Sequence, residues 1–132
     1  MNSFCKSERL THKSLFEELF LSGFSFIKYP FRVVVKESSV PGEYPARIAI
    51  SVSKKKFKAA VKRNRVKRLV REAFRLNKHS FYECAGGQNK TYDIIFIYLD
   101  YQLPSSHLKI EKAMKNSLSH IIKHFHISED AD

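Results

Sequence analysis

Cysteine, tryptophan and long apolar runs are scarce in this chain of 132 residues, and each absence excludes a class of protein. There is no tryptophan, and the two cysteines, Cys5 and Cys84, are too few for a disulfide framework and form no metal-binding motif. No stretch approaches the roughly 20 continuous apolar residues that a transmembrane helix needs. The segment Met1–Arg9 lacks the apolar core of a secretion signal. We therefore expect a cytoplasmic protein with free thiols and no membrane partner.

Glycine and proline are also few, with four of each, whereas apolar residues make up 43% of the chain. Eleven Phe and six Tyr contribute to that fraction, which is enough for one packed core. A chain of this length fits a single domain, 1–132, and we expect residues 1–8 and 126–132 to be frayed termini.

Acidic residues are nearly absent from one segment, Lys54–Arg75. It holds eleven Lys or Arg and one acid, Glu72, so it carries +10 of the net charge of +11. A solubility device would spread its charge over the surface. A concentrated patch repels itself, and a polyanionic partner offsets that repulsion, so the segment predicts nucleic-acid binding more than a solvated basic surface.

Apolar periodicity predicts seven elements along the chain: a helix at 11–22, strands at 24–29, 31–36 and 47–52, a helix at 59–77, a strand at 92–99 and a helix at 104–125. The strand 92–99 is apolar on both faces, which is typical of an interior strand covered on both sides. In the strand 47–52, Ile48, Ile50 and Val52 are expected inward, and Arg47, Ala49 and Ser51 outward. This order indicates an α/β sandwich on a mainly antiparallel sheet.

The helix at 59–77 is expected to separate its apolar and basic residues onto opposite faces. Val66, Leu69, Val70, Ala73 and Phe74 fall on one arc, and the basic residues fall on the other. Arginine suits phosphate because its planar fork donates two parallel hydrogen bonds. The run Lys54–Lys56 precedes the helix and adds charge near its N-terminal amides, which themselves favour anions. The candidate RNA-binding residues are Lys54, Lys55, Lys56, Lys62, Arg63, Asn64, Arg65, Lys67, Arg68, Arg71 and Arg75.

Three sequence motifs carry a resemblance to a known family. Ser51-Val52-Ser53-Lys54-Lys55 is followed by Arg63-Asn64-Arg65-Val66-Lys67-Arg68 and then by Arg71-Glu72-Ala73-Phe74. Their order, spacing and helix register resemble the signature of the bacterial ribonuclease P protein component, and the resemblance extends over about Arg9 to His124. It implies an α+β fold: a two-layer α/β sandwich of order α-β-β-β-α-β-α, with a four-stranded mixed sheet. It also implies a left-handed βαβ crossover, a rare exception to the usual hand.

The function implied by the resemblance is that of a protein subunit in an RNA-based endonuclease. The RNA subunit of ribonuclease P would perform magnesium-dependent hydrolysis and remove the 5′ leader of precursor tRNA. The protein would bind that RNA and hold the leader in a cleft, so its partners would be the ribonuclease P RNA and precursor tRNA. No protein partner is required, and no Mg2+ site is assigned to the protein.

Single residues can be carried over from the family in the same way. The resemblance assigns RNA contacts to Arg63, Asn64, Arg65, Lys67, Arg68 and Arg71. It places Phe16 and Phe20 in the leader cleft, to which we add Arg47 and Ser51; the spacing of both phenylalanines also fits core packing. The chain departs from the family at Phe57, where a glycine is usual, and at Val34, where some members carry a cleft aromatic.

Other functions remain to be weighed against this one. A DNA-binding architectural protein could use the same basic helix, but strands flank that helix and no helix-turn-helix partner is evident. A stand-alone metal nuclease would need clustered acids, and Asp93 and Asp100 are scattered. His120 and His124 lie four residues apart and could share a zinc ion, but no third ligand is evident. No glycine loop that would hold a phosphate occurs. We therefore expect no catalytic residue on the protein.

Overall fold

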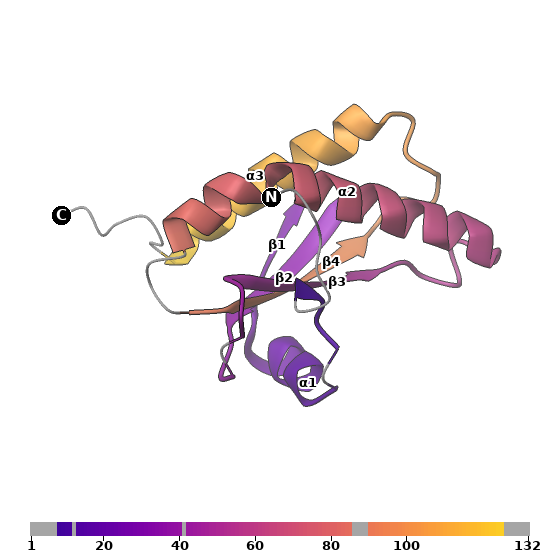
Figure 1. The fold of residues 1–132 in the computed structure, drawn as a ribbon. Helices are drawn as coiled ribbons and strands as arrows, with labels where there is room; N and C mark the ends of the chain where they lie inside the picture. Colours follow the sequence, from indigo (N-terminus) through magenta and orange to yellow (C-terminus); the bar gives the residue numbers. More distant parts are fainter. Residues whose placement is uncertain (1–7, 12, 41, 86–89, 126–132) are drawn as a thin grey trace.

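The predicted order α-β-β-β-α-β-α is the order of the folded chain, seen in a computed structural model that describes residues 8–11, 13–40, 42–85 and 90–125 (Figure 1). The helices are α1 (Lys13–Ser22), α2 (Ala60–Ala85) and α3 (His107–Phe125). The strands are β1 (Phe24–Lys28), β2 (Phe31–Glu37), β3 (Ala46–Ser51) and β4 (Tyr92–Tyr98). Six of the seven elements match their expected bounds within a few residues, and α2 is the exception.

The four strands form one mixed sheet in the order β1-β2-β4-β3. β1 pairs with β2 and β2 with β4 in antiparallel fashion, whereas β3 runs parallel to β4. α2 therefore belongs to the crossover that joins two parallel neighbours. The mixed sheet is confirmed, and the left hand of the crossover stays a prediction from the resemblance.

Helices cover both faces of the sheet, but unequally (Figure 1). α2 and α3 lie side by side on one face and enclose the main core, which includes Phe31, Phe74, Phe96 and Met114. α1 packs on the other face, where Leu15 and Leu19 meet Val34 and Ile95 in a smaller cluster. The expected two layers are thus the sheet and the pair α2 and α3, which enclose the main core. α1 covers part of the other face of the sheet. As expected, β4 lies in the interior and is covered on both sides.

α2 ends eight residues later than expected, at Ala85 rather than Asn77. Its apolar face continues beyond Phe74 through the fully buried Phe81 and Ala85, which pack in the main core. The lysine at position 78 interrupts the apolar pattern on that face, so the sequence suggested an earlier end. Lys78 is nevertheless buried, because its Nζ donates to a carboxylate oxygen of Glu8 at 2.8 Å.

Glu8 also corrects the expectation of a frayed start. This carboxylate is 0% exposed and accepts a second hydrogen bond from the hydroxyl of Tyr82. Two residues later, the amide of Leu10 donates to the carbonyl of Ile48 at 2.9 Å, which ties the N-terminal segment to the free edge of β3. Residues 1–7 and 126–132, also expected to be frayed, lie outside the described residues.

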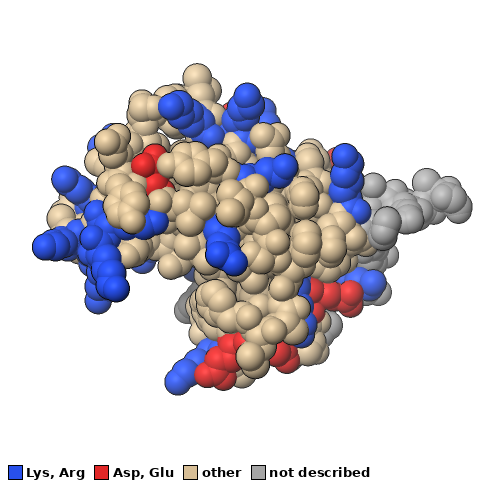
Figure 2. Space-filling view, turned by 180° about the vertical axis from the view of Figure 1, so that it is seen from behind, with Lys and Arg blue, Asp and Glu red and all other residues tan. Residues whose placement is uncertain are grey.

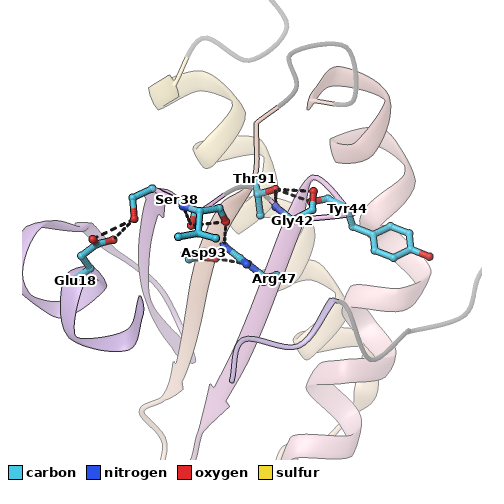
Figure 3. Close-up of polar contacts among 9 residues, drawn as sticks. Glu18, Ser38, Gly42, Tyr44, Arg47, Thr91 and Asp93 are labelled. Atoms are coloured by element: carbon cyan, nitrogen blue, oxygen red, sulfur yellow. Dashed lines mark hydrogen bonds and ion pairs between the residues drawn. The ribbon is translucent and has the colours of Figure 1, made fainter. Parts of the chain in front are cut away.

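Arg47 was expected to point outward into a cleft, and that prediction is wrong. It does lie on the opposite face from Ile48, but the 38–40 turn covers it there, so Arg47 is 8% exposed. Its Nε donates to Asp93 at 2.9 Å, and its Nη2 donates to the hydroxyl of Ser38 and the carbonyl of Val40, each at 2.6 Å (Figure 3). The guanidinium therefore holds a turn against the sheet.

None of the described helices combines the length and the apolar character that a bilayer crossing requires.

Candidate nucleic-acid interface

The basic face of α2 forms as the helical periodicity predicts. Val66, Val70, Ala73 and Phe74 are buried against the rest of the fold, and Leu69 is half-buried. On the other side, Asn64, Arg65 and Arg68 are exposed, and Lys67, Arg71 and Arg75 are half-buried. We call the set Asn64, Arg65, Lys67, Arg68, Arg71 and Arg75 the α2 basic face. Its members share one side of one rigid helix, so they can meet a single polyanion together.

A small hollow lies where the α2 basic face meets the edge of the sheet. It has a volume of about 190 Å³, and Lys67 and Arg71 line it together with Arg9 and residues 48–50 of β3. Burial, and then the charges of Arg9 and Arg68, lower the pKa of Arg71 from its ordinary value. Part of this lowering reflects the neighbouring positive charges, and a phosphate placed in the hollow would offset their repulsion.

Arg9 is a member of this site that the sequence did not predict. Its position depends on the short parallel pairing of the N-terminal segment with Ile48 at the β3 edge. Sequence periodicity does not predict a single β-bridge of this kind. The positive charge of Arg9 was therefore the only feature of the sequence that could have indicated its role.

Two arginines of the basic segment are partly engaged by the protein itself. The Nη1 of Arg63 donates to the carbonyls of Phe57 and Lys58, at 2.8 and 2.9 Å, and so fastens the loop that precedes α2. Arg75 forms an ion pair with Glu72 one turn away on the helix. Arg63 is thus turned back toward the loop rather than outward, and the RNA role assigned to it stays a prediction.

The lysine run before α2 divides into two exposed residues and one engaged residue. Lys54 and Lys55 are exposed, whereas Lys56 donates from its Nζ to the carbonyl of Leu99 at 2.6 Å. Phe57, the departure from the family pattern, is 5% exposed and packs in the main core beside Tyr98. The loop therefore gains a buried anchor where a glycine is usual. Lys62, in the first turn of α2, is exposed.

The predicted cleft residues take different positions around α1. Phe20 is 61% exposed, whereas Phe16 is half-buried and packs against the cluster formed by α1 and the sheet. Ser51 is exposed at the end of β3, as expected. Phe20 and Ser51 are thus accessible, Phe16 is partly so, and Arg47 is not. Val34, where some family members carry an aromatic, is buried beneath α1.

Charge is unevenly distributed over the molecule as a whole. Figure 2 shows basic side chains gathered at the end where α2 begins and along the side of α3, and acidic side chains gathered over α1. Between these regions the face seen in Figure 2 is largely uncharged. A polyanion would therefore be drawn first to the α2 end of the molecule.

The two histidines of α3 have a packing role. Their rings stack on β1, with His124 at 3.6 Å from Phe24 and His120 at 4.2 Å from Phe26 between ring centroids. Within the described part of the chain, no group of three or more His, Cys, Asp or Glu residues gathers as a metal site. Cys84 is a free thiol, and Cys5 lies outside the described residues.

Comparison with known proteins agrees with the motifs and the fold. The sequence profile of the family described as Ribonuclease P matches residues 4–122. The ribonuclease P protein component of Porphyromonas gingivalis is 41% identical over 116 residues, which cover 88% of this chain and 84% of that protein. The same component of Clostridioides difficile is 36% identical over 114 residues, 86% of this chain and 90% of that one.

Solved structures also match this chain over most of its length. The ribonuclease P protein of Thermotoga maritima superposes with a TM-score of 0.66 at 28% identity, covering 86% of this chain and 96% of that chain. The protein of Staphylococcus aureus superposes with a TM-score of 0.62 at 28% identity, covering 92% and 98%. On this agreement of sequence and fold, the chain belongs to the ribonuclease P protein family.

Proposed function

We propose that this chain is the RNA-binding subunit of a ribonuclease P that removes the 5′ leader of precursor tRNA. Family membership makes it a protein component of a tRNA-processing ribonucleoprotein. Within that complex, we assign the α2 basic face to binding of the catalytic RNA. We assign Phe20, Ser51 and the half-buried Phe16 to the border of the leader site. The observation that carries it is the gathering of Lys67, Arg68 and Arg71 on one helix face beside an accessible sheet edge.

Catalysis in this proposal belongs to the RNA subunit. The described side chains contain no cluster of three carboxylate, imidazole or thiol groups that would hold a metal ion. As the family resemblance implies, we place the magnesium ions, and the water activation that they supply, on the RNA. The protein contributes positive charge, which lowers the repulsion between two RNA chains and thereby reduces the magnesium concentration that the complex needs.

The leader would lie along the accessible side of α1 and the end of β3. Unpaired bases stack on aromatic side chains, and each such stack contributes about 1–3 kcal/mol. Phe20 offers an exposed ring for this purpose, whereas Val34 is buried and offers none. We therefore expect fewer stacking contacts with the leader than in family members that carry an aromatic at that strand position.

Reconstitution tests the proposal. The protein is mixed with a bacterial ribonuclease P RNA and a precursor tRNA at a magnesium concentration too low for the RNA alone. We expect cleavage at the mature 5′ end with the complete mixture and none with the protein alone. Absence of stimulation by the protein would contradict the proposed role, and cleavage by the protein alone would contradict the assignment of catalysis to RNA.

A further inference from the structure

Two neighbouring cavities lie away from the α2 basic face, around the loop 99–106 that joins β4 to α3. Figure 1 shows this loop beside the start of α2. One cavity, of about 540 Å³, lies between the loop and the first residues of α2. The other, of about 550 Å³, lies between the loop, the β1–β2 turn and the first turns of α3. Gln102 and Leu103 line both, so the two cavities lie on either side of the same loop, and we call the pair of cavities with the loop between them the loop track.

Positive charge borders both ends of the loop track. Lys58 and Lys62 line the end at α2, and Lys109 and Lys112 line the end at α3. Asp100 is the only acid among the lining residues. With Lys56, which also lines the end at α2, five ammonium groups surround the loop, and together they attract a chain of phosphates.

Exposed aromatic rings stand between these charges. Tyr101 is 71% exposed and Tyr29 is 65% exposed, although aromatic side chains of this size are usually mostly buried. The ammonium group of Lys56 lies over the Tyr101 ring, 4.8 Å from its centroid, and the same group donates to the carbonyl of Leu99. The lysine thus holds the ring in place from one side.

The loop itself is held by its own hydrogen bonds. The hydroxyl of Tyr98 donates to the carbonyl of Gln102 at 2.8 Å, and the amide of Gln102 donates to the carboxylate of Asp100 at 3.2 Å. A site formed in advance loses less entropy when a ligand binds. Asp100 can in addition accept a hydrogen bond from the amino group of a base, as carboxylates do with cytosine.

We propose that the loop track binds a short single-stranded segment of RNA, with phosphates on Lys58, Lys62, Lys109 and Lys112 and a base stacked on Tyr101. Basic side chains that alternate with exposed aromatic rings are the pattern by which proteins hold single strands with little sequence preference. A duplex would not fit, because its bases are already stacked and cannot reach Tyr101. The inference rests on the proposed function only for the choice of RNA over other polyanions.

Binding and cross-linking of a single-stranded probe test this inference. The full-length protein is titrated with a fluorescent oligouridylate of ten nucleotides that contains 4-thiouridine, and a perfect RNA duplex is titrated in parallel. We expect Tyr101→Ala and the double variant Lys109→Ala/Lys112→Ala each to bind the single strand about tenfold more weakly. Tyr101→Phe keeps the ring and should retain wild-type affinity. Cross-links should map to the peptide that contains Tyr101.

A matched control separates a defined site from diffuse attraction. Lys115→Ala/Lys123→Ala removes the same charge from α3 but lies outside the loop track. We expect it to weaken single-strand binding less than twofold. Equal weakening by the two double variants, no effect of Tyr101→Ala, or cross-links confined to α1 and α2 would each overturn the inference. If reconstitution fails while the Tyr101 cross-link forms, the proposed function is wrong and the loop track stands.

Discussion

Arg47 and Asp93 form a buried ion pair between the neighbouring strands β3 and β4, with side chains 9% and 4% exposed. Burial raises the pKa of the Asp93 carboxyl, and hydrogen bonds from Ser38 and the charge of Arg47 act in the opposite direction. Arg47→Met should therefore leave a buried carboxylate without its counter-charge and lower the free energy of unfolding by about 3–5 kcal/mol. Urea denaturation at neutral pH measures this loss.

A second substitution identifies the cause of that loss. In the double variant Arg47→Met/Asp93→Asn no buried charge remains, so part of the stability should return. If Arg47→Met loses less than about 1 kcal/mol, or if the double variant is no more stable than the single one, the pair does not hold the turn as described.

His120 makes the stability of the protein depend on pH. Burial, and then the charges of Lys28, His124 and Lys123, lower its pKa below the ordinary value. The folded state therefore favours the neutral ring, and this contribution is present above the unfolded pKa of about 6.5 and is lost as pH falls through the lower folded pKa. His120→Phe should lose less stability than the wild type between pH 7 and pH 5, because a phenyl ring cannot take up a proton.

Urea titrations at the two pH values measure the difference. The exposed His107→Gln change, measured in the same way, is the control for replacing a histidine at a site that is not packed against β1. An identical loss in wild type and His120→Phe would show that stacking on Phe26 tolerates the charged ring.

At the scale of elements, α1 carries two phenylalanines with different environments. Phe16→Ala removes a ring that packs on the sheet, so it should lower the free energy of unfolding by about 2 kcal/mol. Phe20→Ala removes a ring that is 61% exposed, so it should change stability by about 0.5 kcal/mol or less. If Phe20 contacts the leader, its loss should reduce the preference of the reconstituted enzyme for leader-bearing over leaderless tRNA.

Competition between the two tRNAs in the reconstituted complex measures that preference. An unchanged preference in Phe20→Ala, together with full stability, would remove Phe20 from the leader site. An equal loss of affinity for both tRNAs would indicate general RNA binding instead.

At the scale of the whole molecule, the concentration of charge on one side should control how RNA binding depends on salt. The double variant Arg68→Ala/Arg71→Ala should weaken binding to the catalytic RNA and make the salt dependence shallower by about two counterions, because two phosphate contacts are lost. Affinity measured across a salt titration checks both effects. Lys115→Ala/Lys123→Ala changes the net charge equally and should leave the slope close to wild type; equal slopes for both double variants would contradict a localised face.

The helices and strands could be predicted from the sequence wherever local hydrophobic periodicity decided the structure. The doubly apolar strand 92–99 and the two faces of α2 follow from local periodicity, and each was confirmed, whereas in β3 the alternation failed at Arg47, which is buried. The end of α2 was not predicted, because a buried Lys78 requires a partner 70 residues away in the chain. Arg9 and Lys56 likewise owe their positions to contacts with Ile48 and Leu99 that no local pattern encodes.

By itself the sequence determined the family, the order of elements and the helix that carries the charge, because hydrophobic periodicity and charge density act over a few neighbouring residues. Only the tertiary structure decided which charged residues remain available. It buried Arg47 against Asp93 and turned Arg63 toward its own loop, because a polar group removed from water must find a partner. It also brought Lys62 and Lys109, far apart in sequence, to two cavities on either side of a single loop.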